Sequence, residues 1–291
     1  MRFRTALRYG LLGAALSMVA APASAFGIGL QPTTVEMSME PGDRQRQVVN
    51  LGNVHQEKTI SLTLGLADWG LDENGQIKLA PPGETSTSAA EWVRFSPAFV
   101  TLKPGESEQV VVDMAAPMRI EREGDFRFAL IASTLLPEER SGQSGVWKKY
   151  QIASLFYLTT GEAESKPEIK QATLVQNAEG KQEVLFDLEN TGNAHARLRG
   201  EVVIKGDSGE PIVSPIANLV VLHEATRKYK VQIEGDLPAN PEVKVTLENI
   251  FAPQTSTGII AMDAFEAPLV LEETALDVQP GPAEDAETTL E

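Results

Sequence analysis

The sequence predicts an all-β protein that consists of two β-sandwich domains in tandem. Short apolar or alternating stretches recur along the chain, each bounded by a turn signal, and convincing helical periodicity is missing. With 291 residues, of which 42% are hydrophobic, the chain is long enough for two domains that each bury a core. We therefore expect two sandwiches after an N-terminal targeting segment.

Residues 1–25 have the composition of a signal peptide. Arg2, Arg4 and Arg8 give a cationic start, residues 11–21 are apolar, and residues 23–25 read Ala-Ser-Ala, the small-x-small pattern of a cleavage site. The apolar stretch is shorter than the roughly 20 residues of a membrane-spanning helix, which disfavours an uncleaved anchor. No cysteine follows it, which excludes a lipoprotein anchor. We expect cleavage after residue 25 and a mature chain outside the cytoplasm.

Seven candidate strands make up the first predicted domain, residues 26–160. Most of them alternate apolar and polar side chains, as expected of a strand with one buried face. Turns such as Pro41-Gly42-Asp43 and Pro104-Gly105-Glu106 separate them. The candidate strands are residues 33–39, 45–50, 59–67, 99–102, 109–114, 126–133 and 148–159. Seven strands are enough for a sandwich.

A second series of strands predicts a second domain, residues 161–271. Its first residues, Gly161-Glu162-Ala163-Glu164-Ser165-Lys166-Pro167, are small, charged and end in proline, which indicates a connector between domains. The strands are residues 169–175, 183–188, 198–204, 218–222, 227–233 and 243–248, with a last strand in either 257–262 or 267–271.

Residues 272–291 have the composition of a disordered acidic tail. They contain seven acidic residues, no basic residue, and two prolines that flank Gly281. A solvated tail is the simplest interpretation, and an acidic arm that touches a basic partner is the alternative.

Composition argues against nucleic-acid binding and gives no sign of enzymatic chemistry. The formal net charge is −16, the pI is near 4.7, and removal of residues 1–25 leaves 22 basic and 41 acidic residues, a net charge of −19. Cysteine is absent, which removes thiol nucleophiles, thiolate zinc sites and disulfides. No nucleophile elbow, phosphate loop, zinc helix or dinucleotide fingerprint is present. We therefore expect no catalytic residue, no metal and no cofactor.

Two local patterns suggest ligand sites but have a simpler interpretation. Asp72-Glu73-Asn74-Gly75 begins like a calcium loop, yet Gln76 and Gly83 stand where calcium ligands are needed, so a hairpin tip is expected. The pattern N-x-G-N-x-H occurs at Asn50 and again at Asn190, after the second candidate strand of each half. It predicts two similar corners, with an Asn/His ligand site as the alternative. His55, His195 and His223 are the only histidines, each expected to face solvent at a strand end.

The three tryptophans are the large apolar anchors of the first half. We expect at least two of Trp69, Trp92 and Trp147 to pack the core of the first sandwich. Trp147 follows the polar loop 137–145, so core packing and contact with a partner are both open for this residue.

Several segments of the first half resemble the PapD-like periplasmic chaperones, which escort pilus subunits to an outer-membrane usher. Trp92-Val93-Arg94-Phe95-Ser96-Pro97, with the strands and Pro-Gly turn that follow up to Met114, is similar to one run of this family. Residues 124–130 and Leu155-Phe156-Tyr157 resemble two further strands. The resemblance covers residues 26–271 and implies two immunoglobulin-like β-sandwiches in the periplasm.

The resemblance also implies a mechanism and a site. Such a chaperone lends a strand to a pilin-like exported subunit that lacks its last strand, and it grips the subunit's terminal carboxylate with a basic pair. In this chain the two basic positions fall on Ser154 and within residues 31–34, where no basic residue stands. The predicted subunit-binding residues are Val146, Trp147, Lys148, Lys149, Tyr150, Ile152 and Ser154.

Within this set, Val146, Tyr150 and Ile152 are the candidates to fill a groove in the subunit, because they are the large apolar members of one alternating face. Lys148 and Lys149 either offer replacement charge or block unwanted strand pairing. The prediction is a non-enzymatic periplasmic chaperone of a pilus or other surface-structure subunit, with an usher as a second partner. The alternative is an immunoglobulin-like structural, adhesive or envelope-scaffold module that hands over no subunit.

Overall fold

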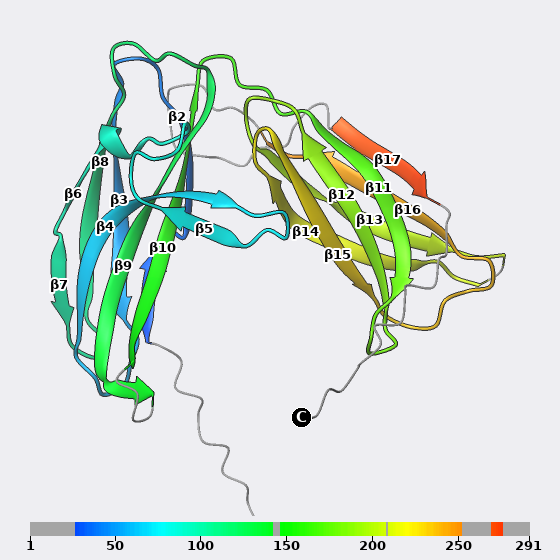
Figure 1. Ribbon diagram of the computed structural model, residues 1–291, viewed down its shortest axis with the longest axis horizontal. Coiled ribbons are helices and arrows are strands. Elements are labelled where there is room, and N and C mark those ends of the chain that lie inside the picture. The colour runs from blue at the N-terminus through cyan, green and yellow to red at the C-terminus, as the bar shows by residue number, and fades with distance from the viewer. Residues whose placement is uncertain (1–26, 142–145, 208, 252–268, 276–291) are drawn as a thin grey trace, which may run out of the picture.

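The computed structural model describes residues 27–141, 146–207, 209–251 and 269–275, with backbone alone for 135–141, 146–148 and 269–275. It confirms the predicted fold class, because the chain forms two β-sandwiches in tandem (Figure 1). The predicted signal peptide and residues 276–291 of the predicted tail lie outside the described residues. Within the described part of the chain, no helix has the length and hydrophobicity needed to cross a membrane.

The first sandwich contains two sheets. Its strands are β1 (Ile28–Gln31), β2 (Thr34–Ser38), β3 (Arg44–Asn53), β4 (Ile60–Leu71), β5 (Ile77–Ala80), β6 (Val93–Ser96), β7 (Phe99–Leu102), β8 (Ser107–Ala115), β9 (Gly124–Ser141) and β10 (Val146–Thr160), with a 3-10 helix at Ala90–Trp92. One sheet has the order β1-β3-β8-β6. The other has the order β2-β10-β9-β4-β5, and β7 also pairs with β4. The chain therefore crosses from one sheet to the other between β1 and β2.

The second sandwich follows after residues 161–166. Its strands are β11 (Pro167–Gln176), β12 (Gln182–Asn190), β13 (Ala196–Lys205), β14 (Ile212–Val221), β15 (Ala225–Ile233), β16 (Glu242–Asn249) and β17 (Leu269–Ala275). They form a sheet β11-β12-β15 and a sheet β14-β13-β16-β17. The last strand thus overlaps the second of the two predicted positions and runs four residues into the predicted tail, while residues 257–262 lie outside the described residues.

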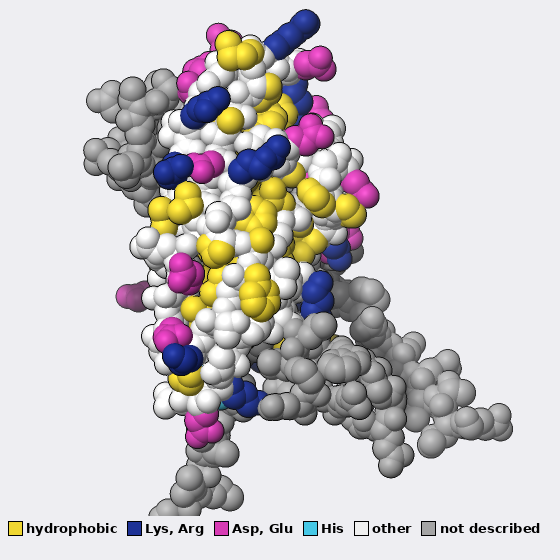
Figure 2. Space-filling view, turned by 90° about the vertical axis from the view of Figure 1, so that its left-hand side faces the viewer, with side chains coloured by type: hydrophobic (Ala, Val, Ile, Leu, Met, Phe, Trp, Pro, Cys, Tyr) yellow, Lys and Arg dark blue, Asp and Glu magenta, His cyan; other side chains and the backbone are white. Residues whose placement is uncertain are grey.

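Each sandwich has its own core, built from the inward side of alternating strands. In the first core, the rings of Phe128 and Phe156 stack with centroids 4.3 Å apart, and Trp92 packs against the same cluster. In the second core, Phe186 packs against Tyr229 at 5.3 Å. Figure 2 views the first sandwich from the side away from the second, where hydrophobic side chains gather along the middle of the face.

The repeated Asn pattern marks a corner in each sandwich, but its register is different from the prediction. Asn50 is exposed within β3, and Asn53 takes the corner role instead. The side chain of Asn53 accepts a hydrogen bond from the His55 N–H and donates to the Leu102 carbonyl. Asn190 likewise accepts from the Gly192 N–H and donates to the Ala194 carbonyl. Both corners are therefore closed by a buried carboxamide.

Candidate functional site

The edge of β10 is covered by the protein's own chain along only part of its length. One side of β10 pairs with β9 from Val146 to Thr160. On the other side, β2 pairs in parallel with the segment from Leu155 to Thr159, and the Leu155 N–H donates to the Thr33 carbonyl at 2.9 Å. In the described part of the chain, no strand covers this side of β10 between residues 146 and 154. We call this stretch the open edge.

The backbone groups that point out of the open edge follow from the alternation of a β-strand. Because the Leu155 N–H points toward β2, every second residue before it directs its N–H and C=O to the same side. These residues are Ala153, Gln151 and Lys149, and the register with β9 is regular from Lys148 onward. The open edge therefore offers three consecutive hydrogen-bonding positions to an added strand.

The predicted subunit-binding side chains divide between the two faces of β10. Ile152 packs partly buried against the first core, and Tyr150 is half-buried on the same face. On the opposite face, Lys149 is exposed, and the Gln151 amide donates to Ser133 Oγ at 3.1 Å. The side chains of Val146, Trp147 and Lys148 lie outside the described set, so both interpretations of Trp147 stay open.

Ser154 is the last residue of the open edge, and its side chain points into the protein. Its side chain is fully buried, and its hydroxyl donates to the Pro32 carbonyl at 2.6 Å. The two segments where the resemblance places a basic pair therefore do meet in space. They meet through a neutral hydrogen bond, and the hollow beside them is lined by residues 31–34 and Asn50, none of them charged.

The two sandwiches contact each other through an apolar cluster on the outer face of β4, β9 and β10. Trp69, Ile131 and Tyr157 of the first sandwich pack with Leu222 of the second, all at most 5% exposed. The Trp69 indole N–H donates to the Phe128 carbonyl at 3.0 Å, and its ring meets Tyr157 edge-on at 4.8 Å. Trp69 is thus an anchor between the domains, whereas Trp92 belongs to the first core.

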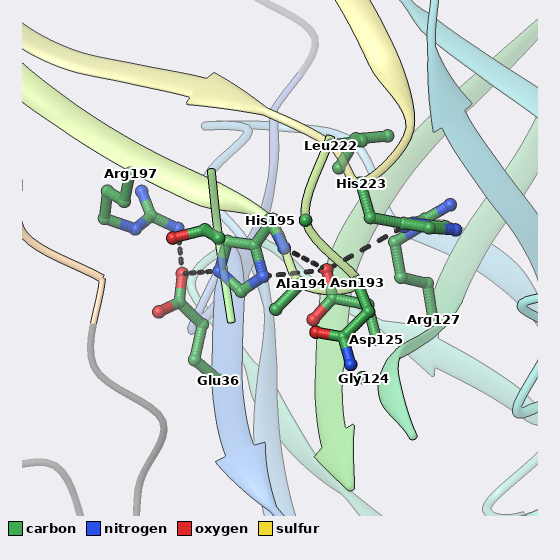
Figure 3. A network of polar contacts seen from close by, with 12 residues as sticks. Glu36, Gly124, Asp125, Arg127, Asn193, Ala194, His195, Arg197, Leu222 and His223 are labelled. Atoms are coloured by element: carbon green, nitrogen blue, oxygen red, sulfur yellow. Dashed lines mark hydrogen bonds and ion pairs between the residues drawn. The ribbon is translucent and has the colours of Figure 1, made fainter. Parts of the chain in front are cut away.

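A buried polar network crosses the same contact beside this cluster (Figure 3). Asp125 of β9 accepts hydrogen bonds from the His195 backbone N–H at 2.7 Å and pairs with His195 Nδ1 at 2.9 Å. Both side chains are fully buried, contrary to the expectation that His195 faces solvent. Because this carboxylate belongs to the first sandwich and the histidine to the second, the pair links the two domains.

Cationic side chains extend the network on both sides. Arg127 lies 4.0 Å from Asp125, donates to Thr87 and contacts His223 Nδ1 at 3.2 Å. Burial lowers the pKa of the Arg127 guanidinium, and burial together with Arg127 lowers the pKa of His223. On the other side, Arg197 of the second sandwich forms an ion pair with Glu36 of β2. The strand that covers part of β10 is therefore itself tied to the second domain.

The hairpin between β4 and β5 makes a third contact between the domains. Its tip, residues 72–76, is closed by bonds to Asp72, as predicted for a hairpin. The Glu73 carbonyl accepts a hydrogen bond of 2.6 Å from the Lys228 N–H on β15, and the Glu73 carboxylate lies 3.1 Å from Lys228 Nζ. Gly75 lies against the Arg227 guanidinium, where a Cβ would come within 2.2 Å of it. We call this hairpin the strap.

Replacement of Lys228 by proline is expected to release the strap without unfolding β15. The Lys228 N–H points away from β12, so proline removes the bond to Glu73 and spares the ladder with β12. Small-angle X-ray scattering should show a broader range of distances between the domains. Lys230→Pro is the matched control, because its N–H faces the same side two residues further along and donates no bond to the strap. Equal scattering from both variants would show that the strap does not fix the domains.

Sequence reasoning missed the residues that join the two domains. Glu36, Asp125, Arg127, His195 and Arg197 lie on four different strands or corners, and no spacing in the sequence shows that they meet. The only local signal was His195 in the repeated corner pattern. Among the described residues, no group of three or more His, Asp or Glu side chains is placed to hold a metal ion.

Comparison with known proteins adds similarities of fold. The chain matches no family model and no curated protein. Among solved structures, it is similar to one chain of a chaperone–tip adhesin complex of CFA/I fimbriae biogenesis, with 11% identity and a TM-score of 0.42 over 85% of this chain and 97% of that chain. It is also similar to the class 5 fimbriae chaperone CfaA, with 12% identity and a TM-score of 0.40 over 86% and 100%.

A third similar structure is one chain of the CsuC–CsuE chaperone–tip adhesion subunit pre-assembly complex of Acinetobacter baumannii. It shares 16% identity, with a TM-score of 0.41 over 84% of this chain and 97% of that chain. All three similarities are distant, with at most 16% identity and TM-scores of at most 0.42.

Proposed function

We propose that the protein is a PapD-like periplasmic chaperone that holds an exported, β-rich subunit of a pilus or other surface structure by strand addition. The observation that carries this proposal is the open edge of β10. Only the last part of this strand, from Leu155 to Thr159, is covered by β2. An unpaired strand edge can pair with another chain, and natural proteins usually protect such edges. A function that uses the edge explains why it is open.

The two faces of the open edge suit this role. A strand that adds to the edge gains backbone hydrogen bonds from Lys149, Gln151 and Ala153, while the half-buried Tyr150 and Ile152 offer apolar contacts on one face. The segments quoted above from the first half resemble the same family. The subunit would be retained by backbone pairing and apolar contacts, because no basic pair stands beside Ser154.

One observation favours a second candidate function. The neutral Ser154–Pro32 contact replaces the charged grip that the resemblance implies, which is what an envelope-scaffold or adhesive module without subunit handover would show. Such a module would keep its partner permanently, whereas a chaperone would pass the subunit on to an usher.

Substitution of Ile152 by aspartate tests the proposed chaperone function. The tagged protein, purified from its native periplasm, is expected to carry one small β-rich exported protein in a one-to-one complex, identified by mass spectrometry. Ile152→Asp should abolish this recovery, because a charge would enter an apolar contact. Ile152→Val is the control that keeps the apolar contact, and thermal unfolding of the free variants separates loss of binding from loss of fold. Unchanged recovery with Ile152→Asp would reject the site.

A further inference from the structure

A groove lies on the outer face of the sheet β2-β10-β9-β4-β5, next to the open edge. Its floor is formed by β4, β9 and β10, where Thr63, Gly65, Ser133 and Gln151 face outward. Its wall is β5 with the residue that follows it, and Leu79 and Pro81 line the groove there. The groove thus lies across three strands of the first sandwich and ends at the open edge.

The chemistry of the groove is unusual for this protein. The mature chain has a large excess of carboxylates, yet Glu57 is the one carboxylate among the residues that line the groove, and Lys58 and Lys149 are its two cations. At Gly65, an added Cβ would meet no atom within 4 Å, so the floor is open at its centre. Leu79 on the wall is 45% exposed. Apart from Glu57, Lys58 and Lys149, the lining is uncharged, and together with the exposed apolar wall it suits uncharged and apolar side chains of a protein partner.

The wall of the groove is held in place by the second domain. The strap carries β5 on its return arm, and its tip is bonded to Lys228 of β15. A groove with a fixed wall needs no ordering when a partner binds, which favours binding.

The groove and the open edge share residues. Gln151 and Lys149 line the groove with their side chains and direct their backbone groups out of the open edge. A strand added to the open edge would extend the floor of the groove by one strand. Any part of the same partner that folds back over this face would then enter the groove.

We propose that the groove is a second contact area for the subunit that pairs with the open edge, and that it receives an uncharged, partly apolar segment of that subunit. This inference rests on the proposed chaperone function. It adds a contact that strand addition alone does not require, on a face where no sequence pattern indicated a binding role.

Site-specific photo-crosslinking in the native periplasm tests the inference. The probe is a benzophenone amino acid, placed at Thr63 on the groove floor, at Tyr150 on the open edge, or at the exposed Val213 of β14 as a control. We expect the probes at Thr63 and Tyr150 to crosslink to the same exported subunit. The probe at Val213 should give no crosslink of comparable yield, either to this subunit or to another protein.

The other outcomes separate the two proposals. A crosslink from the probe at Tyr150 but not from the probe at Thr63 would overturn the proposed contact in the groove and would leave the proposed chaperone function unaffected. A crosslink from the probe at Thr63 alone, or from neither probe, would overturn strand addition at the open edge. The proposed groove contact depends on strand addition and would be overturned with it. As a second measurement, Leu79→Glu should reduce recovery of the subunit at least fivefold without changing the thermal unfolding of the free protein, whereas Leu79→Met should not. Equal recovery with Leu79→Glu would also overturn the groove.

Discussion

Replacement of Gln151 by proline is expected to abolish recovery of the exported subunit while the free protein stays folded. The Gln151 N–H points out of the open edge, so proline removes a bond to the added strand and places its ring in that strand's path. The ladder with β9 is made by the neighbouring residues and is left intact. A lost backbone bond alone costs about 1–3 kcal/mol, roughly a 5- to 150-fold loss of affinity, and the ring adds to it.

The matched control is Gln151→Ala, which removes the side chain and its bond to Ser133 but keeps the N–H. It should recover the subunit nearly as well as the unchanged protein. Circular dichroism and thermal unfolding of both variants show whether the fold is kept. If Gln151→Pro and Gln151→Ala recover the subunit equally, the backbone of the open edge does not bind it.

Replacement of Asp125 by alanine is expected to cause the largest loss of stability of any single substitution considered for this protein. Asp125 is fully buried. Its carboxylate accepts a hydrogen bond from the His195 backbone N–H, pairs with His195 Nδ1, and lies beside the buried guanidinium of Arg127. Removing Asp125 leaves His195 and the buried charge of Arg127 without their carboxylate partner, and the loss of one partner of a buried charge typically costs about 3–5 kcal/mol. The midpoint of urea unfolding should fall accordingly.

Asp113→Ala provides the comparison on the surface. Asp113 accepts two bonds from Arg46, the shorter at 2.6 Å, yet both side chains are at least half exposed. Exposed ion pairs contribute little to stability because water screens them. We expect the urea midpoint of Asp113→Ala to stay close to that of the unchanged protein. Similar losses for both variants would contradict the role assigned to the buried network.

Most strands could be predicted because they follow local patterns. Alternation and flanking turns place β3, β8, β12 and β16 within a few residues of their observed bounds. The four-residue strands β1, β5 and β6 were missing from the candidate strands, whereas β7, of the same length, was found, because the Pro104-Gly105 turn marks its end. The extent of β14 was also underestimated, because Ser214 and Pro215 interrupt its apolar pattern.

The candidate site was predictable in outline only. Alternation in residues 146–158 indicated which side chains share a face, and family resemblance indicated the strand. Which half of the strand is open depends on where β2 ends its pairing, and that is a long-range property that no local pattern records. The same holds for Ser154, whose burial depends on the distant Pro32, and for the pairing of Asp125 with His195 across the domains.

Amide hydrogen exchange of β10 tests the central claim most directly. In the free protein, we expect the N–H groups of Lys149, Gln151 and Ala153 to exchange quickly, while Leu155, bonded to Thr33, exchanges slowly. In the purified complex with the exported subunit, all three fast amides should become protected. If they are already protected in the free protein, or stay unprotected in the complex, strand addition at the open edge is contradicted.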